Sequence, residues 1–152
     1  MSIISDASTD LSSVVSYLKR YEDKLEEIRS IFEIEGKKLE AVNRTLPGYL
    51  ARYDEIYNEL KTLEEFLDKK RDTIVSPLWK KYNEKYSRQL SQRDITAYIA
   101  GEPEYVSITE LIIEVKLLKE KYGAVVKALE QMGWSLKNIV ELRVHELQDA
   151  VL

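Results

Sequence analysis

A basic segment that also carries aromatic side chains is the part of this sequence best suited to binding chemistry. Residues 69–93 have a net charge of +6, whereas the whole 152-residue chain has a net charge of −4. Lysine and arginine neutralise phosphates, and aromatic faces stack on unpaired nucleobases. The candidate nucleic-acid-binding residues are Lys69, Lys70, Arg71, Trp79, Lys80, Lys81, Tyr82, Lys85, Tyr86, Arg88 and Arg93. This pattern predicts a localised site for single-stranded nucleic acid rather than a diffuse basic surface.

The same segment has a simpler interpretation as the solvated face of a helix. Runs of charge usually cover such a face, and Trp79, Tyr82 and Tyr86 follow steps of three and four that also suit core packing. The spacing of Lys80, Lys81 and Lys85 places them close to one helical face, together with Arg88. The charge imbalance within an acidic chain favours the binding interpretation.

The sequence offers little for catalysis or metal binding. There is no cysteine, and the five glycines form no phosphate-binding loop. His145 is the only histidine, with Glu141 and Asp149 four residues to either side. A surface network is the simpler interpretation of that trio than a set of metal ligands. We therefore expect no enzymatic activity, no cofactor and no metal site.

Composition indicates a helical protein without membrane-spanning segments. A content of 33% charged and 44% hydrophobic residues suits a folded helical chain of this length. The first 13 residues lack the basic and apolar regions of a signal peptide. No apolar run approaches the ~18 residues that a membrane helix needs. We expect a cytoplasmic protein that does not bind membranes.

The first third of the chain carries a heptad pattern. Apolar residues recur at alternating steps of three and four from Leu11 to Leu46, with Glu35 as the one interruption. Such a seam is typical of a coiled coil and predicts one helix about 54 Å long. A narrow apolar stripe must pack on another helix of the chain or on another copy. We therefore expect the seam residues Leu18, Leu25 and Ile28 to support oligomerisation.

Prolines and glycines divide the rest of the chain. Pro47 is compatible with a turn between antiparallel helices or with a kink, because the apolar spacing continues in phase through residues 49–67. Pro77 predicts a new helix over 78–90, and Gly133 predicts the end of a strongly apolar helix. No useful β-alternation occurs. The expected fold is all-α, with long coiled-coil-like N-terminal helices followed by a small helical bundle in an oligomer.

Four stretches in the second half carry a family resemblance. A capped element, Arg93-Asp94-Ile95-Thr96-Ala97-Tyr98-Ile99, is followed by residues 102–108, a long apolar helix and the run 134–143. In this order and spacing, residues 50–147 resemble the UvsY recombination mediators of T-even-like tailed phages and cyanophages. Those proteins likewise have a long helix that ends in a basic, tyrosine-rich stretch.

The resemblance implies a function and a division of the chain. Such mediators form rings, bind single-stranded DNA and help a RecA-like recombinase to displace single-strand-binding protein. By position, the DNA-binding stretch of the family falls on residues 80–82. Its oligomerising segment falls on Leu136, Ile139, Val140 and Arg143. Residues 1–46 form an N-terminal heptad extension, and residues 47–152 form the mediator-like domain.

A second function stays open. An oligomeric coiled-coil adaptor, scaffold or chaperone without a nucleic-acid role explains the heptads and the acidity equally well. It does not explain why the basic residues concentrate between positions 69 and 93.

Overall fold

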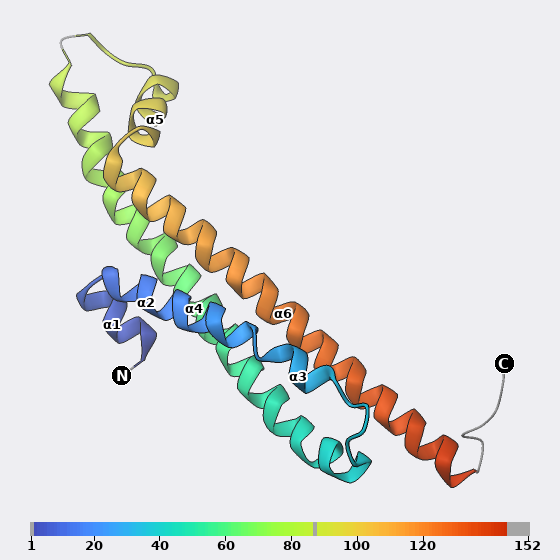
Figure 1. Ribbon diagram of the computed structural model, residues 1–152. Coiled ribbons are helices and arrows are strands. Elements are labelled where there is room, and N and C mark those ends of the chain that lie inside the picture. Colours follow the sequence, from blue (N-terminus) through green and yellow to red (C-terminus); the bar gives the residue numbers. More distant parts are fainter. Residues whose placement is uncertain (1, 87, 146–152) are drawn as a thin grey trace.

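Helices make up the architecture that the computed structural model describes for residues 2–86 and 88–145 (Figure 1). Within these ranges there is no strand, so the predicted all-α class is confirmed. The elements in this part of the chain are α1 (Ile3–Thr9), α2 (Ser12–Leu25), α3 (Ile28–Phe32), α4 (Leu39–Lys85), α5 (Gln92–Ala100) and α6 (Pro103–Val144).

Two long antiparallel helices, α4 and α6, form the axis of the molecule (Figure 1). They contain 47 and 42 residues, which corresponds to about 70 and 63 Å of helix. The stripes of buried side chains that join them recur at steps of three, four or seven, the repeat that keeps one helical face inward. These residues are Val42, Leu46, Tyr53, Ile56, Leu60, Leu63 and Leu67 of α4, and Ile108, Ile112, Val115, Leu118, Tyr122, Leu129 and Leu136 of α6.

The N-terminal helices lie mainly against one half of this hairpin, and only the start of α2 reaches residues of the other half, where Leu11 and Val15 line a hollow with Thr73. Helices α2 and α3 lie beside the half that contains the start of α4 and the end of α6 (Figure 1). The Tyr122 hydroxyl donates a hydrogen bond to the Tyr21 carbonyl at 2.6 Å, and the Tyr21 hydroxyl donates to the Glu59 carboxylate. We call residues 2–68 and 111–145 the three-helix half. Residues 69–86 and 88–110, where α4 and α6 are joined through α5, are called the tip.

The prediction of one continuous helix over residues 11–46 is wrong. Helix α2 ends at Leu25, α3 ends at Phe32, and α4 begins only at Leu39. The break surrounds Glu35, the residue that interrupted the heptads, and Gly36 adopts a φ of +75° that suits glycine. The reversal lets α2 bury Val14 and Leu18 against the rest of its own chain.

The opposite correction applies downstream, where helices continue through expected boundaries. Helix α4 runs through Pro47 and Pro77, so the domain boundary expected at residue 47 and the new helix expected at 78 both fall inside α4. Helix α6 runs through Gly133 to Val144, and Leu46 Cδ2 lies 3.5 Å from where a Cβ at Gly133 would stand. Around Pro47 and Gly133, in-phase burial on both sides outweighs the lost backbone bond of the proline and the flexibility of the glycine.

Candidate nucleic-acid interface

The basic residues of the segment 69–93 all lie in the tip, but they form separate groups. Lys69 and Lys70 precede Lys80 by ten or more residues of α4, or about 15 Å along the helix axis. Arg71 is half-buried and already engaged, because its guanidinium lies 3.0 Å from the Asp68 carboxylate and 5.9 Å from the Tyr105 ring centroid. The structure therefore separates residues 69–71 from the cations at the end of α4.

The second group surrounds the carboxyl end of α4. Lys80, Lys81 and Lys85 are exposed on its last turns, and Arg88 and Arg93 are exposed beyond them. Within the described ranges, ion pairs are recorded for none of Lys80, Lys85, Arg88 and Arg93. Helix α4 ends at Lys85, before Arg88. Arg88 therefore does not share a helical face with the three lysines, contrary to the prediction from the sequence. This group presents cations to solvent from two helices and the segment between them.

Tyrosines form a platform beside these cations. The rings of Tyr82, Tyr86 and Tyr98 lie within 20° of parallel. Their centroids are 6.0 Å apart for Tyr82–Tyr86, 5.4 Å for Tyr82–Tyr98 and 6.1 Å for Tyr86–Tyr98. If the three rings were stacked in a single column, the centroids of the first and last rings would be about twice as far apart as those of neighbouring rings. The three similar distances therefore show that the rings are stacked with a lateral offset rather than in one column. Tyr86 and Tyr98 are each 48% exposed, so both residues are accessible from solvent.

Trp79 is placed differently from the other predicted aromatic residues. It is half-buried in α4, and among the described rings it makes no ring–ring contact. Trp79 and Tyr82 are both absent from the described side chains that pack against the main core, so the internal packing expected for one of these aromatic residues stays a prediction.

Glu102, at the start of α6, joins that helix to α4 beside the platform. Its carboxylate accepts hydrogen bonds from the Tyr82 hydroxyl and from Lys81 Nζ, the latter at 3.3 Å. Lys81 Nζ also lies 5.2 Å from the centroid of the Tyr82 ring. The bond to Glu102 raises the pKa of Tyr82 to about 12, and the bonds from Tyr82 and Lys81 lower the pKa of Glu102. Tyr82 is therefore a neutral donor, and Glu102 an anion, at neutral pH.

Tyr98 and Glu102 are site residues that sequence reasoning did not select. Both come from outside the basic segment and reach it only because α5 folds back along α4 (Figure 1). The signal for this reversal was present, since Ser91 and Asp94 form the capping box that starts α5 and Gly101 ends it. The packing of the short helix on α4 was not encoded in any local pattern.

The residues predicted for oligomerisation divide by burial. Leu18 and Leu136 belong to the core of the chain itself, with 7% and 1% of their surface exposed. Leu25, Ile28 and Ile139 are half-buried against that core. Val140 and Arg143 are exposed near the end of α6. In this fold, only the latter two present their side chains freely to another subunit.

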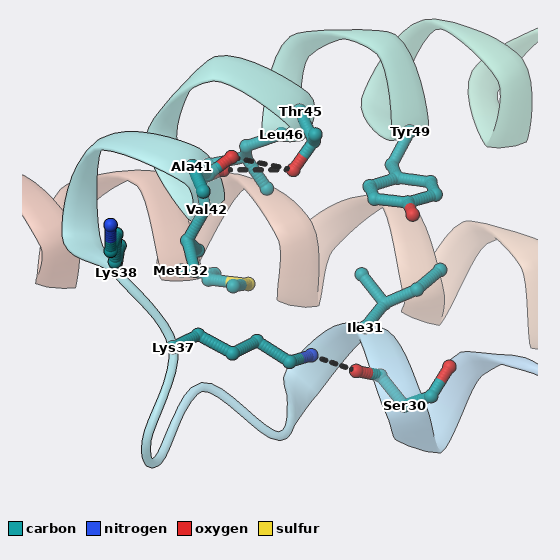
Figure 2. Close-up of a pocket in the computed structure, with 10 residues that line it drawn as sticks. All are labelled: Ser30, Ile31, Lys37, Lys38, Ala41, Val42, Thr45, Leu46, Tyr49 and Met132. Carbon is teal, nitrogen blue, oxygen red and sulfur yellow. Dashed lines mark hydrogen bonds between the residues drawn. The ribbon is translucent and has the colours of Figure 1, made fainter.

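A hollow lies at the end of the molecule opposite the tip, between α3, α4 and α6 (Figure 2). It encloses about 360 Å³, with Ile31, Val42, Leu46 and Met132 among its apolar walls. Two of its polar side chains are engaged locally: Lys37 Nζ donates to the Ser30 carbonyl at 2.6 Å, and Thr45 Oγ1 donates to the Ala41 carbonyl at 3.1 Å. We therefore place the candidate site at the tip rather than here.

Neither a cluster of metal ligands nor a membrane-spanning helix is found in the described part of the chain. No group of three or more histidine, cysteine or acidic side chains in this part of the chain is arranged to hold a metal ion. Asp149, one of the trio considered with His145, lies outside the described residues. None of the described helices has the length and apolar character required to cross a membrane.

Comparison with known proteins adds no relative. Neither the protein-family models nor the curated proteins and solved structures that were compared with this chain match it.

Proposed function

We propose that this chain is a recombination mediator that binds single-stranded DNA through its tip and assists a RecA-like recombinase in loading onto strands covered by single-strand-binding protein. The observation that carries the DNA-binding part is the concentration of exposed cations and a tyrosine platform at one end of an otherwise acidic molecule. The cations would neutralise phosphates, and the tyrosines would stack on bases with little sequence preference.

The proposed working form is a homo-oligomer, with a ring as the expected arrangement, in the cytoplasm of the host cell if a phage encodes it. A single tip offers only a few phosphate contacts. Several tips on one assembly would make each later contact effectively intramolecular, which raises avidity without new contacts. We place the contacts between subunits away from the tip. Val140 and Arg143 support this placement, because both are exposed near the end of α6. The mediator role itself rests on the resemblance of residues 50–147 to the UvsY family.

DNA binding is tested by fluorescence anisotropy of labelled oligo-dT over a range of salt concentrations, with light scattering to follow oligomer size. The double variant Lys80→Ala/Lys81→Ala should bind more weakly. If both lysines contact phosphates, the slope of log affinity against log salt should fall in magnitude by about 1.4, or ~0.7 per lost contact. The matched control is Lys37→Ala/Lys38→Ala, an adjacent exposed pair at the opposite end. Equal effects of the two double variants would contradict a site at the tip.

The loading role needs a separate experiment. We expect the chain to shorten the lag in DNA-dependent ATP hydrolysis by a RecA-like recombinase on DNA covered with single-strand-binding protein. It should have little effect on bare DNA, where there is nothing to displace. DNA binding without this stimulation would leave a single-strand-binding module that is not a mediator.

A second function is favoured by a different surface. Val15, Ile113 and Leu117 are 58%, 60% and 55% exposed on α2 and α6, although each is a large apolar side chain. Exposed apolar residues of this kind suit contacts between proteins. An oligomer that does not bind oligo-dT even at low salt would support the adaptor or scaffold function, with the basic tip as a contact for an acidic protein.

A further inference from the structure

Glu102 occupies a position in the fold that its own helix does not require. It is the N-cap residue of α6, yet its side chain makes no capping hydrogen bond. Glutamate is not among the preferred N-cap residues. Its carboxylate instead turns to α4, where it accepts from Tyr82 and Lys81. The contact therefore links two helices beside the tyrosine platform rather than completing the start of one.

The groups that Glu102 engages are those that a nucleic-acid phosphate would use. A lysine ammonium and a tyrosine hydroxyl donate hydrogen bonds to anionic oxygens, and carboxylate and phosphate both present such oxygens. The Lys81 side chain is still 45% exposed, so its ammonium is accessible from solvent. A phosphate approaching Lys81 would compete with the Glu102 carboxylate for the same donor.

The platform lies next to this anion position. Lys81 Nζ is 5.2 Å from the centroid of the Tyr82 ring, and the Tyr98 ring centroid lies 5.4 Å from that of Tyr82. In a single-stranded nucleic acid, each base is joined to its phosphate through one sugar. Donors for an anion and open aromatic faces within this range match the two ends of one nucleotide.

We propose that Lys81, Tyr82, Tyr86 and Tyr98 form a subsite for one nucleotide of single-stranded nucleic acid, in which Glu102 holds the phosphate position until a phosphate displaces it. The base stacks on the exposed faces of Tyr86 and Tyr98, and the phosphate takes the place of the carboxylate on Lys81. The proposal rests on the proposed DNA binding and deepens it in two ways. It adds Tyr98 as a stacking residue and makes Glu102 an internal competitor of the ligand.

Stacking is tested with two probes of equal length and charge, an oligo-dT and an abasic oligonucleotide. Tyr98→Ala should weaken oligo-dT binding about tenfold, within the roughly 5- to 150-fold range for loss of one base–aromatic stack. It should leave abasic binding unchanged, whereas Tyr98→Phe should retain both affinities because it keeps the ring. Tyr49→Ala, at a 39% exposed tyrosine of the three-helix half, is the matched control. Equal losses on both probes would show that Tyr98 only supports the tip, and would overturn its stacking role.

Competition is tested with Glu102→Gln, which keeps an acceptor for Tyr82 but removes the negative charge. We expect tighter binding of both probes, about threefold at low salt, and a salt slope larger in magnitude by up to about 0.7. Glu104→Gln makes the same charge change two residues away at an exposed position and controls for net charge. Weaker or unchanged binding by Glu102→Gln, or an equal gain in the control, would overturn the competitor role.

These experiments distinguish failure of the proposed DNA binding from failure of the nucleotide subsite. If the unmodified chain binds neither probe at low salt, the proposed function fails and the subsite fails with it. If the chain binds both probes and Lys80→Ala/Lys81→Ala weakens them, but Tyr98→Ala and Glu102→Gln match their controls, the function stands and the subsite is wrong. Helix content measured by circular dichroism identifies any variant that fails to fold, and Tyr98→Leu then replaces Tyr98→Ala.

Discussion

The two halves of α4 use the same helix for different purposes. Before residue 68, its apolar stripe is buried from Val42 to Leu67 against α6 and the N-terminal helices. After residue 68, none of its described residues is buried, and lysines and tyrosines occupy the surface. Each fully buried leucine contributes roughly 1.5–3 kcal/mol to folding. The three-helix half therefore anchors a helix whose other half is available for binding.

The distribution of charge follows the same division. Clustered cations repel one another, so a net charge of +6 in residues 69–93 does not favour the fold by itself. The carboxyl end of α4 offsets part of this cost, because the helix dipole favours positive charge at that end. Charge that is concentrated and exposed is better explained by a ligand than by stability. The predictions below test whether the two halves differ in this way.

The largest expected effect distinguishes burial in the two halves. Leu60 is fully buried in the three-helix half, whereas Ile99 is a buried residue of α5 and lies outside the main core cluster. Leu60→Ala should lower the free energy of unfolding by about 2–5 kcal/mol, because it leaves a cavity in a closely packed core. Ile99→Ala should mainly release α5, since a short helix with only two buried residues can open locally. Urea unfolding gives the first value, and hydrogen exchange of residues 92–100 gives the second.

Leu117→Ala is the control for these variants, because Leu117 is 55% exposed on α6. Its effect should stay within about 0.5 kcal/mol. If Ile99→Ala lowers the global unfolding free energy as much as Leu60→Ala, the tip belongs to the same cooperative unit and the two halves do not differ in stability.

The next effect concerns the Tyr82–Glu102 bond. Because this bond raises the pKa of Tyr82 to about 12, its contribution to holding α6 against α4 is complete from neutral pH to about pH 10 and is lost as the pH rises through about 12. Tyrosinate absorbance of the unmodified chain minus that of Tyr82→Phe should show this late titration. Glu102→Gln should return the titration of Tyr82 toward its ordinary value of 10.0. An ordinary pKa in the unmodified chain would contradict the bond.

The smallest effect compares two ion pairs of α4. The Lys119–Glu64 pair joins α6 to α4 with side chains only 19% and 18% exposed, whereas the Arg44–Glu40 pair lies within α4 with side chains 77% and 82% exposed. Double-mutant cycles should give a coupling of about 1 kcal/mol for the first pair and about 0.3 kcal/mol for the second. Raising the salt concentration should weaken the exposed pair more. Equal couplings would mean that the α4–α6 contact does not shield its charges.

Local sequence patterns predicted that the segments are helical better than they predicted where each helix begins and ends. The apolar spacing through Pro47 was continuous, yet a proline is locally unfavourable within a helix, so a turn and a kink stayed open until packing on α6 was known. Conversely, Glu35 was the one polar residue in a seam that is otherwise apolar from Leu11 to Leu46, and the chain leaves the helix around it. Boundaries depend on the balance between local cost and tertiary burial, which a single residue type does not reveal.

The candidate site shows the same limit. Composition alone located the cations of residues 69–93, because charge and residue type are read directly from the chain. It did not separate Arg71, which is engaged by Asp68 and Tyr105, from the exposed lysines near the end of α4. Nor did it select Tyr98, which joins the platform from a different helix.

The amino-acid order was sufficient for the helical class, the periodic apolar stripes and the position of the basic segment, because helix periodicity and charge are local properties. The fold in three dimensions determined that the N-terminal stripe packs on its own chain and that α5 returns to α4. It also brought Glu102 and Tyr98 beside Lys81 and Tyr82. The Tyr82–Tyr98 contact joins residues 16 positions apart, and the Lys81–Glu102 contact joins residues 21 positions apart. Such pairings depend on the global balance of burial rather than on any local preference.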